Sequence, residues 1–350
     1  MNGKEREKFG AEELAICLSY YDLGIIRKIQ EFPRGSRRAP KLLIDAERGR
    51  FLFKRRAKGK DDLAKVAFTH QIQLALAGQN FPLPHLLGTR NENNSMLVLE
   101  GSIYELFEYI SGGGYDGSLD ATTHSGRILG LYHKLLRGFQ SDYRPPEGSY
   151  HNAEAIHQAI RNTVSALPID SRPPSEVLSG TVNFLEHAYV TCAEEVNKLG
   201  LNEWPKQIVH GDWHPGNMLF RDRHVVAVID YDAARLQQRV IDFSNGALQF
   251  SIIGGNEDPN HWPEYLDKTR FKRFMVGYDS VCEGQDVVTV AEIKAAPYLM
   301  CEAMIAEAVL PIAATGSFGR FDGFDFLQMI ERKVKWIFSH LGDLQGVLQD

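Results

Sequence analysis

A short window of the chain concentrates residue types that bind metal ions or move protons. Residues 208–220 read IVHGDWHPGNMLF. A Pro-Gly pair inside the window prevents regular helix or sheet pairing, so we expect a loop that leaves a strand. This loop carries Asp212 and Asn217, five positions apart, and a loop held between strands can direct both side chains to one point.

A second polar cluster follows the next strand. Residues 225–235 read VVAVIDYDAAR, so the strand ends at Asp230, and Asp232 faces the same way if the chain stays extended. Together with the preceding loop this gives three or four oxygen ligands at one place. Hard oxygen donors suit Mg²⁺, which proteins usually hold by one or two carboxylates together with substrate phosphates. The pattern is typical of phosphoryl transfer.

The two histidines of the window allow a different interpretation. His210, Asp212 and His214 alternate, which would place all three on one face of a strand and could form a transition-metal site. The proline that follows and the downstream asparagine favour magnesium instead. We expect His210 to lie at the strand end and to hydrogen-bond the backbone of the next loop.

The order of polar residues along the chain matches the arrangement of protein kinases. Kinases have an aspartate with an asparagine five positions later, a metal-binding aspartate downstream and a lysine on an N-terminal strand. Asp212 and Asn217 have this spacing, and Asp230 lies 13 residues beyond Asn217. Lys54 ends the apolar stretch FLFK in the first part of the chain. The set of phosphate-transfer residues is therefore complete.

The first hundred residues carry the signals of an antiparallel sheet. Residues 24–32 and 40–56 alternate apolar and polar positions, with a turn at ERG, and residues 95–110 predict two more strands separated by EGS. Residues 61–79 have apolar positions at helical spacing. After the glycine-rich joint at 111–118 the chain is mostly helical, so we predict an α+β plan with two lobes.

Composition excludes several classes of partner. With 39 Lys and Arg against 45 Asp and Glu the net charge is −6, so we expect no nucleic-acid or membrane partner, and the oligomeric state stays open. The basic run KRRAKGK at 54–60 is either a solvated loop or a surface that faces phosphates. Four dispersed cysteines argue against a zinc site and suit a reducing compartment. With a charged N-terminus and no apolar run of about 18 residues, we expect a cytoplasmic protein.

At this point the chain resembles a known family, the aminoglycoside phosphotransferase and choline kinase-like superfamily, including its homoserine-kinase-type and spore-coat kinase-like members. The family signature is H-G-D-x-x-x-x-N followed by a strand that ends I-D, an aromatic residue, and D or E. This chain has HGDWHPGN and IDYD. The similarity runs from about residue 25 to about 247. It implies a bilobal protein-kinase-like fold, with a small antiparallel-sheet N-lobe with one main helix and a larger, mostly helical C-lobe.

The resemblance also implies an activity and a division of the chain. The activity is ATP-dependent transfer of the γ-phosphate to a hydroxyl of a small molecule, an amino alcohol, a sugar or an aminoglycoside, with GTP as an alternative donor. Residues 1–104 would form the nucleotide-binding lobe and 105–118 the hinge and joint. Residues 119–350 would form the lobe with the catalytic loop, the metal site and the acceptor pocket.

The resemblance assigns roles to the polar residues of the C-terminal lobe. Asp212 would be the catalytic aspartate that orients the acceptor hydroxyl. Asn217 and Asp230 would hold Mg²⁺ against the phosphates. Asp232 would be either a further metal-binding carboxylate or a partner in a surface salt bridge. In a loose transition state, positioning and charge neutralisation matter more than proton abstraction.

Nucleotide-binding residues are expected in the N-terminal lobe. Lys54 would contact the inner phosphates, and Gly35 and Ser36, in the turn FPRGSRRAP, would donate backbone N–H groups to them. The backbone from Glu108 to Ile110 would meet the adenine edge.

One position of the family pattern is not filled. The helix over 61–79 offers His70, Gln71 and Gln73 where many relatives carry the glutamate that fixes the lysine. The partner of Lys54 is then absent or comes from elsewhere.

Several further residues have structural or functional interpretations. We expect Asp242 to cap a helix and brace the catalytic loop, and His133 to pack between the lobes. Trp213 could line the acceptor pocket. Glu302 and Glu307 are either exposed helix charges or ligands for an amine of the acceptor.

Three functions remain under comparison. The first is a small-molecule kinase, the second a protein Ser/Thr kinase, and the third a pseudokinase-type scaffold. Only 12 residues separate Asp230 from Asp242, too few for the activation segment that a peptide substrate would require. Intact Asp212, Asn217 and Asp230 argue against the scaffold.

Overall fold

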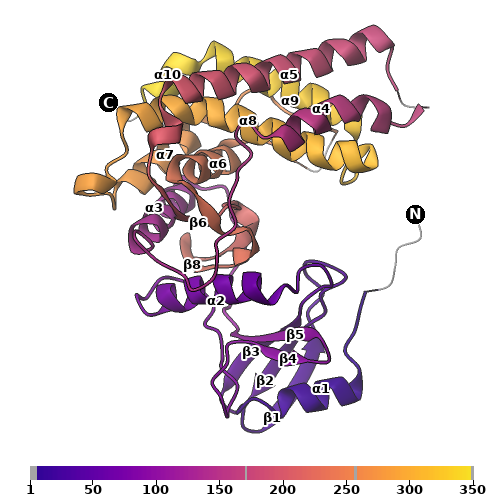
Figure 1. Cartoon of the computed structure of the whole chain (residues 1–350), viewed down its shortest axis with the longest axis vertical. Helices are drawn as coiled ribbons and strands as arrows, with labels where there is room; N and C mark the ends of the chain where they lie inside the picture. Colours follow the sequence, from indigo (N-terminus) through magenta and orange to yellow (C-terminus); the bar gives the residue numbers. More distant parts are fainter. Residues whose placement is uncertain (1–5, 170–171, 256–257, 348–350) are drawn as a thin grey trace.

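The computed structural model describes residues 6–169, 172–255 and 258–347 and has two lobes stacked along its long axis. Figure 1 shows a small sheet-containing lobe at one end and a larger helical lobe at the other, with α2 (Leu63–Ala77) between the sheet and the helical lobe. This is the predicted α+β bilobal arrangement.

A five-stranded antiparallel sheet forms the N-lobe. Its strands follow the order β1-β2-β3-β5-β4, with bounds β1 Ile26–Glu31, β2 Lys41–Ala46, β3 Gly49–Arg55, β4 Leu97–Leu99 and β5 Ser102–Glu108. The alternation of apolar and polar residues predicted these strands and both of their tight turns. Asp62 caps α2 by accepting from the Lys65 amide, and the helix ends near the predicted glycine.

A further N-terminal helix was missed by the sequence prediction. The helix α1 (Ala11–Leu18) has only eight residues, too few for a clear periodic signal. It packs on the face of the sheet away from the C-lobe, where Cys17, Tyr21 and Phe53 share one apolar cluster.

The C-lobe is built around one long buried helix, α8 (Val290–Thr315). The other helices are α3 Leu119–Leu135, α4 Glu154–Ala166, α5 Ser175–Lys198, α6 Arg239–Ser251, α7 Lys268–Asp279, α9 Gly323–Ser339 and α10 Leu341–Gln345. By length and composition α8 could cross a membrane, but most of its apolar window is buried inside this lobe. It is the core helix, against which α4, α5, α6 and α9 pack.

Four short strands carry the polar motifs. The two predicted strands are β6 (Lys206–Val209) and β8 (His224–Val228), and each has a partner that was not predicted. β6 pairs with β9 (Arg235–Gln238), and β8 pairs with β7 (Met218–Arg221). A last hairpin follows α8. Its two strands, β10 (Ser317–Phe318) and β11 (Phe321–Asp322), have two residues each.

The segment predicted as the hinge overlaps the end of β5. Residues 105–108 belong to β5 and pair with β3, so the predicted hinge at 105–118 begins inside the sheet. The apolar residues of β5 are buried by the sheet, which extends the N-lobe to Glu108.

Candidate active site

The catalytic loop holds Asp212 and Asn217 in direct contact. The Asn217 side-chain amide donates to the backbone carbonyl oxygen of Asp212 (3.0 Å) and to the Asp212 carboxylate Oδ2 (2.9 Å). Burial alone would raise the pKa of Asp212, but the hydrogen bond and charge of His214, with Asn217, lower it. The Asp212 carboxylate therefore stays ionised at neutral pH and can accept a hydrogen bond from a hydroxyl group.

A buried carboxylate behind the loop fixes its backbone. Asp242 accepts hydrogen bonds from the His210 and Gly211 amides, each at 2.9 Å, and lies 3.1 Å from His133 Nε2. This confirms the predicted bracing role. The predicted cap is wrong, because Asp242 lies inside the first turn of α6, which begins after Gln238. His133 is also not between the lobes: it is buried within the C-lobe.

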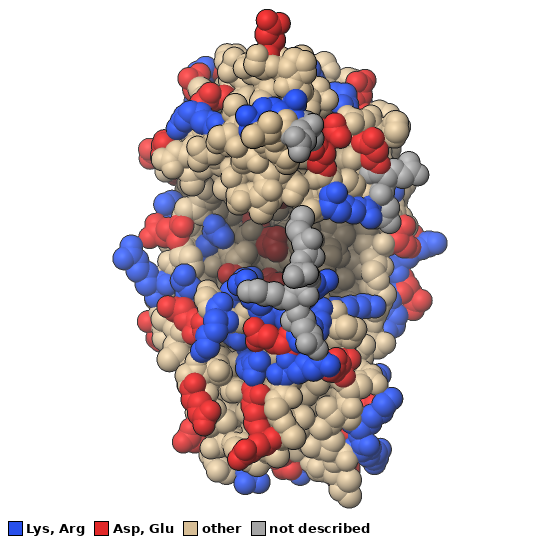
Figure 2. All heavy atoms as spheres, turned by 90° about the vertical axis from the view of Figure 1, so that its right-hand side faces the viewer, with Lys and Arg blue, Asp and Glu red and all other residues tan. Residues whose placement is uncertain are grey.

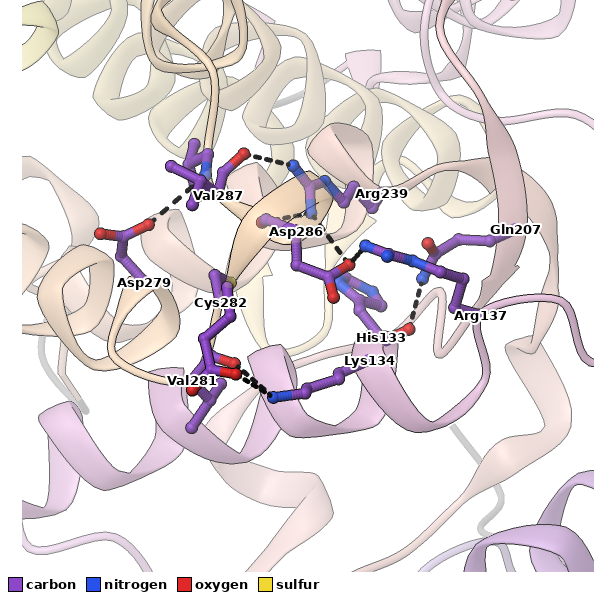
Figure 3. Close-up of polar contacts among 12 residues, drawn as sticks. His133, Lys134, Arg137, Gln207, Arg239, Asp279, Val281, Cys282, Asp286 and Val287 are labelled. Carbon is purple, nitrogen blue, oxygen red and sulfur yellow. Dashed lines mark hydrogen bonds and ion pairs between the residues drawn. The ribbon is translucent and has the colours of Figure 1, made fainter.

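A wider hydrogen-bond network supports this brace. Figure 3 shows Arg239 of α6 donating to the Val287 and Asp286 carbonyl groups, with Arg137, which follows α3, directed at the Asp286 carboxylate. Gln207 of β6 donates to the His133 carbonyl (3.1 Å). The network joins α3, β6 and α6, the three elements that position the catalytic loop.

Asp230 is presented by a strained backbone. It follows β8 with φ +64° and ψ 72°, a left-handed conformation uncommon for residues other than glycine and frequent at functional sites. The Ile229 amide donates to the Asn217 carbonyl oxygen (2.9 Å), which places Asp230 next to the catalytic loop. Among the described residues the Asp230 carboxylate has no hydrogen-bond or ion-pair partner, so its oxygens are available to a cation.

Asp232 is not aligned with Asp230 as the sequence predicted. Residues Tyr231–Ala233 form a 3-10 turn, so the extended form that would have aligned Asp232 with Asp230 does not persist. Asp232 Oδ1 accepts from Arg56 Nη1 at 2.9 Å, which makes it an ion-pair partner across the two lobes. Within the described ranges no group of three or more His, Cys, Asp or Glu is arranged to hold a metal, which contradicts the alternative His-Asp-His site.

The partner of Lys54 is a glutamate of the neighbouring strand. Lys54 Nζ lies 3.3 Å from Glu105 Oε2, and the two residues are directly opposite in the β3–β5 pair. Glu105 is fully buried and also accepts two hydrogen bonds from Arg56, at 2.8 and 2.9 Å. His70 Nε2 of α2 lies 2.8 Å from Glu105 Oε1. The helix thus supplies a histidine, while the sheet supplies the acid.

The basic run at 54–60 begins inside β3, and its first side chains alternate between the two faces of the sheet. Lys54 and Arg56 face the C-lobe, and Arg55 between them points to the opposite face, where it pairs with Glu13 and Glu7 of the N-terminal segment. The interpretation of this run as a solvated loop is therefore wrong for its first three residues.

The loop between β1 and β2 is held by the N-terminal segment. Arg6 donates to the carbonyl oxygens of Pro33, Gly35 and Ser36 at 2.8–3.3 Å. Gly35 has φ +80°. In the described part of the chain the Gly35 and Ser36 amides donate to no other group, so both N–H groups are free for a phosphate.

The predicted hinge backbone is only partly available. The Glu108 amide donates to the His85 carbonyl (2.8 Å), so only the Glu108 carbonyl remains for an adenine. The Tyr109 amide likewise donates to the Arg50 carbonyl (2.9 Å). The Ile110 amide donates to no other described residue and is the free donor of this segment.

Comparison with known proteins fits this geometry. The model of the phosphotransferase enzyme family matches residues 28–271, which include the N-lobe sheet, the catalytic loop and α6. The chain belongs to the phosphotransferase enzyme family. The first residue of the match follows α1, so α1 and the preceding segment lie outside the matched region.

The named relatives of this chain are distant in sequence. Stress response kinase A of Salmonella paratyphi A is 25% identical over 214 residues, which are 61% of this chain and 59% of that protein. The chain thus matches about three fifths of the length of this curated relative.

Solved structures show the same fold. A microcompartment-associated aminopropanol kinase superposes with a TM-score of 0.68 at 13% identity, covering 96% of this chain and 99% of that one. Amicoumacin kinase hAmiN, in complex with AMP-PNP, Ca²⁺ and Ami, has a TM-score of 0.65 at 11% identity, covering 95% and 94%.

The space between the lobes is lined by charges of both signs. Figure 2 shows a hollow between them, with acidic atoms in its depth and many Lys and Arg side chains on its N-lobe side. On the C-lobe side, Glu307 of α8 accepts from Gln249 (2.8 Å) and is accessible to water. Surrounding protein atoms raise the pKa of Glu307, and Asp212 raises it further. Glu307 and Asp212 are therefore close enough for their charges to interact.

The other acceptor-site candidates lie outside the cleft. Trp213 is fully buried and packs against His210, with ring centroids 5.3 Å apart, so it cannot line an open pocket. Burial lowers the pKa of His210, which makes it a neutral packing residue. Glu302 is also fully buried and pairs with His151 at 2.9 Å.

Two residues of the site were missed by sequence reasoning, Glu105 and Arg56. One signal was present: Glu105 is a charged residue in the apolar stretch IYELF, and a buried charge requires a partner.

Proposed function

We propose that this phosphotransferase moves the terminal phosphate of ATP to a hydroxyl group of a small molecule that also carries an amine. The observation that carries the proposal is the pairing of Asp212 with Asn217 beside the unpartnered Asp230, with Lys54 on the facing lobe. Phosphoryl transfer depends mainly on positioning and charge neutralisation, and this arrangement supplies both.

The residues fit a divalent cation of the magnesium type. The side-chain nitrogen of Asn217 is directed at Asp212, which leaves the Asn217 side-chain oxygen as a ligand, and the Asp230 carboxylate is unpaired within the described part of the chain. Two hard oxygen donors from the protein are the usual number for Mg²⁺ bound together with phosphates. When bound, Mg²⁺ would neutralise charge on the phosphate oxygens.

The protein residues divide the remaining work. The ionised Asp212 carboxylate accepts a hydrogen bond from the acceptor hydroxyl and orients its oxygen toward the phosphate. Lys54, oriented by Glu105, contacts the phosphates from the N-lobe. The free amides of Gly35 and Ser36 cover the phosphates, and the Glu108 carbonyl with the Ile110 amide meets the adenine.

An acidic acceptor site supports an amine on the substrate. Glu307 and Asp212 place two carboxylates in one cleft, and His214 lies 3.6 Å from the Asp212 carboxylate. A protonated amine would relieve the repulsion between the two carboxylates. The named structural neighbours include an aminopropanol kinase, in keeping with an amino alcohol.

A peptide acceptor has less support. One curated relative carries the name serine/threonine protein kinase RdoA. In this chain the segment after Asp230 passes through one turn directly into β9, which pairs with β6 and leads into α6. This leaves no free segment to bind a peptide.

The metal site is tested by nucleotide binding. In calorimetric titrations of the native chain, we expect Mg²⁺ to tighten ATP binding by about tenfold or more, because Asp230 would hold the ion and the ion would neutralise phosphate charge. Asp230→Asn should remove this dependence, whereas Asp222→Asn, at an exposed left-handed turn position that asparagine tolerates, should retain it. Absence of ATP and GTP binding by the native chain would refute the proposed activity.

The acceptor class is tested at Glu307. With 1-amino-2-propanol as acceptor, Glu307→Gln should raise KM about 10- to 100-fold, the range expected for a lost hydrogen bond to a charged group. With 1,2-propanediol, which has the same carbon chain without the amine, KM should not change. Steady-state assays with both compounds decide the point, and an equal change for both would rule out amine recognition by Glu307.

A further inference from the structure

A second lysine lies beside Lys54 on the cleft face of the sheet. Lys41 of β2 is directly opposite Lys54 of β3, and Lys54 is directly opposite Glu105 of β5. Directly opposite residues of antiparallel strands project from the same face. The three side chains therefore form one row across the sheet, facing the C-lobe.

The Lys41 ammonium group lies under the loop that covers the phosphates. A Cβ atom built on Gly35 would be 2.8 Å from Lys41 Nζ, so the ammonium group lies directly against the turn at Gly35. Burial lowers the pKa of Lys41, Lys54 lowers it further, and Asp230 and Asp232 act in the opposite direction. The ammonium group thus lies against the loop and beside Lys54, close enough to the two aspartates after β8 for their charges to interact.

Lys41 differs from Lys54 in having no acidic partner among the residues that the structure describes. Lys54 is paired with Glu105, whereas no carboxylate of the described residues lies within ion-pair distance of Lys41. Two lysines and the Arg6 guanidinium in one partly buried region repel each other, and an anion between them would remove this cost.

We propose that Lys41 is a second phosphate-binding lysine, which binds the outer phosphates of the nucleotide under the Gly35–Ser36 turn. The inference rests on the proposed function and adds a residue to the same site. Lys54, restrained by Glu105, then contacts the inner phosphates. Lys41 neutralises negative charge on the outer phosphates, which the uncharged amides of the loop cannot do.

Calorimetric titration of the full chain with Mg-ATP, Mg-ADP and AMP tests this role. Lys41→Met should weaken ATP binding by about tenfold or more, weaken ADP binding less, and leave AMP binding unchanged, because charge-assisted bonds to the outer phosphates are lost. Lys41→Arg should retain most of the affinity. The matched control is Lys28→Met, at an exposed position of β1 in the same sheet.

Amine labelling provides a measurement that needs no substitution. When the native chain reacts with an amine-reactive ester, Mg-ATP should protect Lys41 from labelling and AMP should not, with Lys28 labelled equally throughout. Mass spectrometry of the labelled peptides gives the two rates.

The outcomes separate the two proposals. If the native chain binds ATP but Lys41→Met binds ATP as tightly as the native chain, the role of Lys41 is wrong and the proposed function stands. Equal weakening of ATP and AMP would also overturn it, because the lysine would then shape the lobe and not hold phosphates. If the native chain binds no nucleotide, both proposals fail.

Discussion

Asp212→Asn is expected to lower kcat by about 10²–10⁴-fold, the range typical of a lost general base or orienting carboxylate. Asparagine keeps the oxygen that accepts the hydrogen bond from Asn217, so the loop should keep its shape. The substitution removes the negative charge and replaces the other carboxylate oxygen by an amide donor. The KM for the nucleotide should therefore stay near the native value, and steady-state kinetics with an amino alcohol acceptor provide both constants.

A matched variant separates chemistry from folding. Asp222→Asn makes the same chemical change on the exposed turn between β7 and β8, and it should leave kcat unchanged. Equal thermal midpoints for the two variants would exclude a folding defect. A kcat for Asp212→Asn within about threefold of native would show that this carboxylate is not catalytic, because orienting groups contribute far more.

Glu105→Gln is expected to have the largest effect on stability. The substitution leaves the shape of the side chain but removes the negative charge that Lys54 and Arg56 share in a fully buried position. Removing one member of a buried ion pair costs about 3–5 kcal/mol of unfolding free energy. Urea unfolding of the native chain and the variant measures this difference, and nucleotide affinity should fall with it.

The pH dependence of that difference gives an independent check. Burial would raise the pKa of Glu105, but Lys54, His70 and Arg56 hold it well below its ordinary value. A lowered folded-state pKa stabilises the protein above the unfolded-state value, about 4.3 for glutamate, and this stabilisation is lost as pH falls through the folded-state value. The difference between native and Glu105→Gln should therefore be full at neutral pH and shrink in acid.

A surface ion pair of the same sheet serves as the control. Asp45→Asn removes the partner of Arg50 at a position open to water, which should cost about 0–1 kcal/mol. If Glu105→Gln costs no more than Asp45→Asn, the buried network does not stabilise the lobe.

The catalytic loop was predictable because its information is local. Asp212 and Asn217 lie five residues apart, and the proline between them excludes the regular alternatives, so the spacing alone defines a loop that can join them. The strands of the N-lobe were predictable for the same reason, since a period of two residues is visible within a single strand.

The partner of Lys54 was not predictable in this way. Glu105 lies 51 positions from Lys54, and only the register of β3 and β5 brings them together. The position of Asp232 depends on the left-handed backbone conformation of Asp230, and no periodic pattern in the sequence predicts that conformation. α1 was too short for a periodic signal, and the Arg6 contacts with the loop join residues that are far apart in the chain.

The strand position of Glu105 bears on how such an enzyme could be regulated. In protein kinases the acid that pairs with the lysine lies on a movable helix, and displacement of that helix switches the enzyme off. Here the acid and the lysine are cross-strand neighbours, so their pairing lasts as long as the sheet itself. An outward movement of α2 would remove only the His70 contact. We therefore expect an enzyme that is always switched on, with its output set by the supply of its substrates.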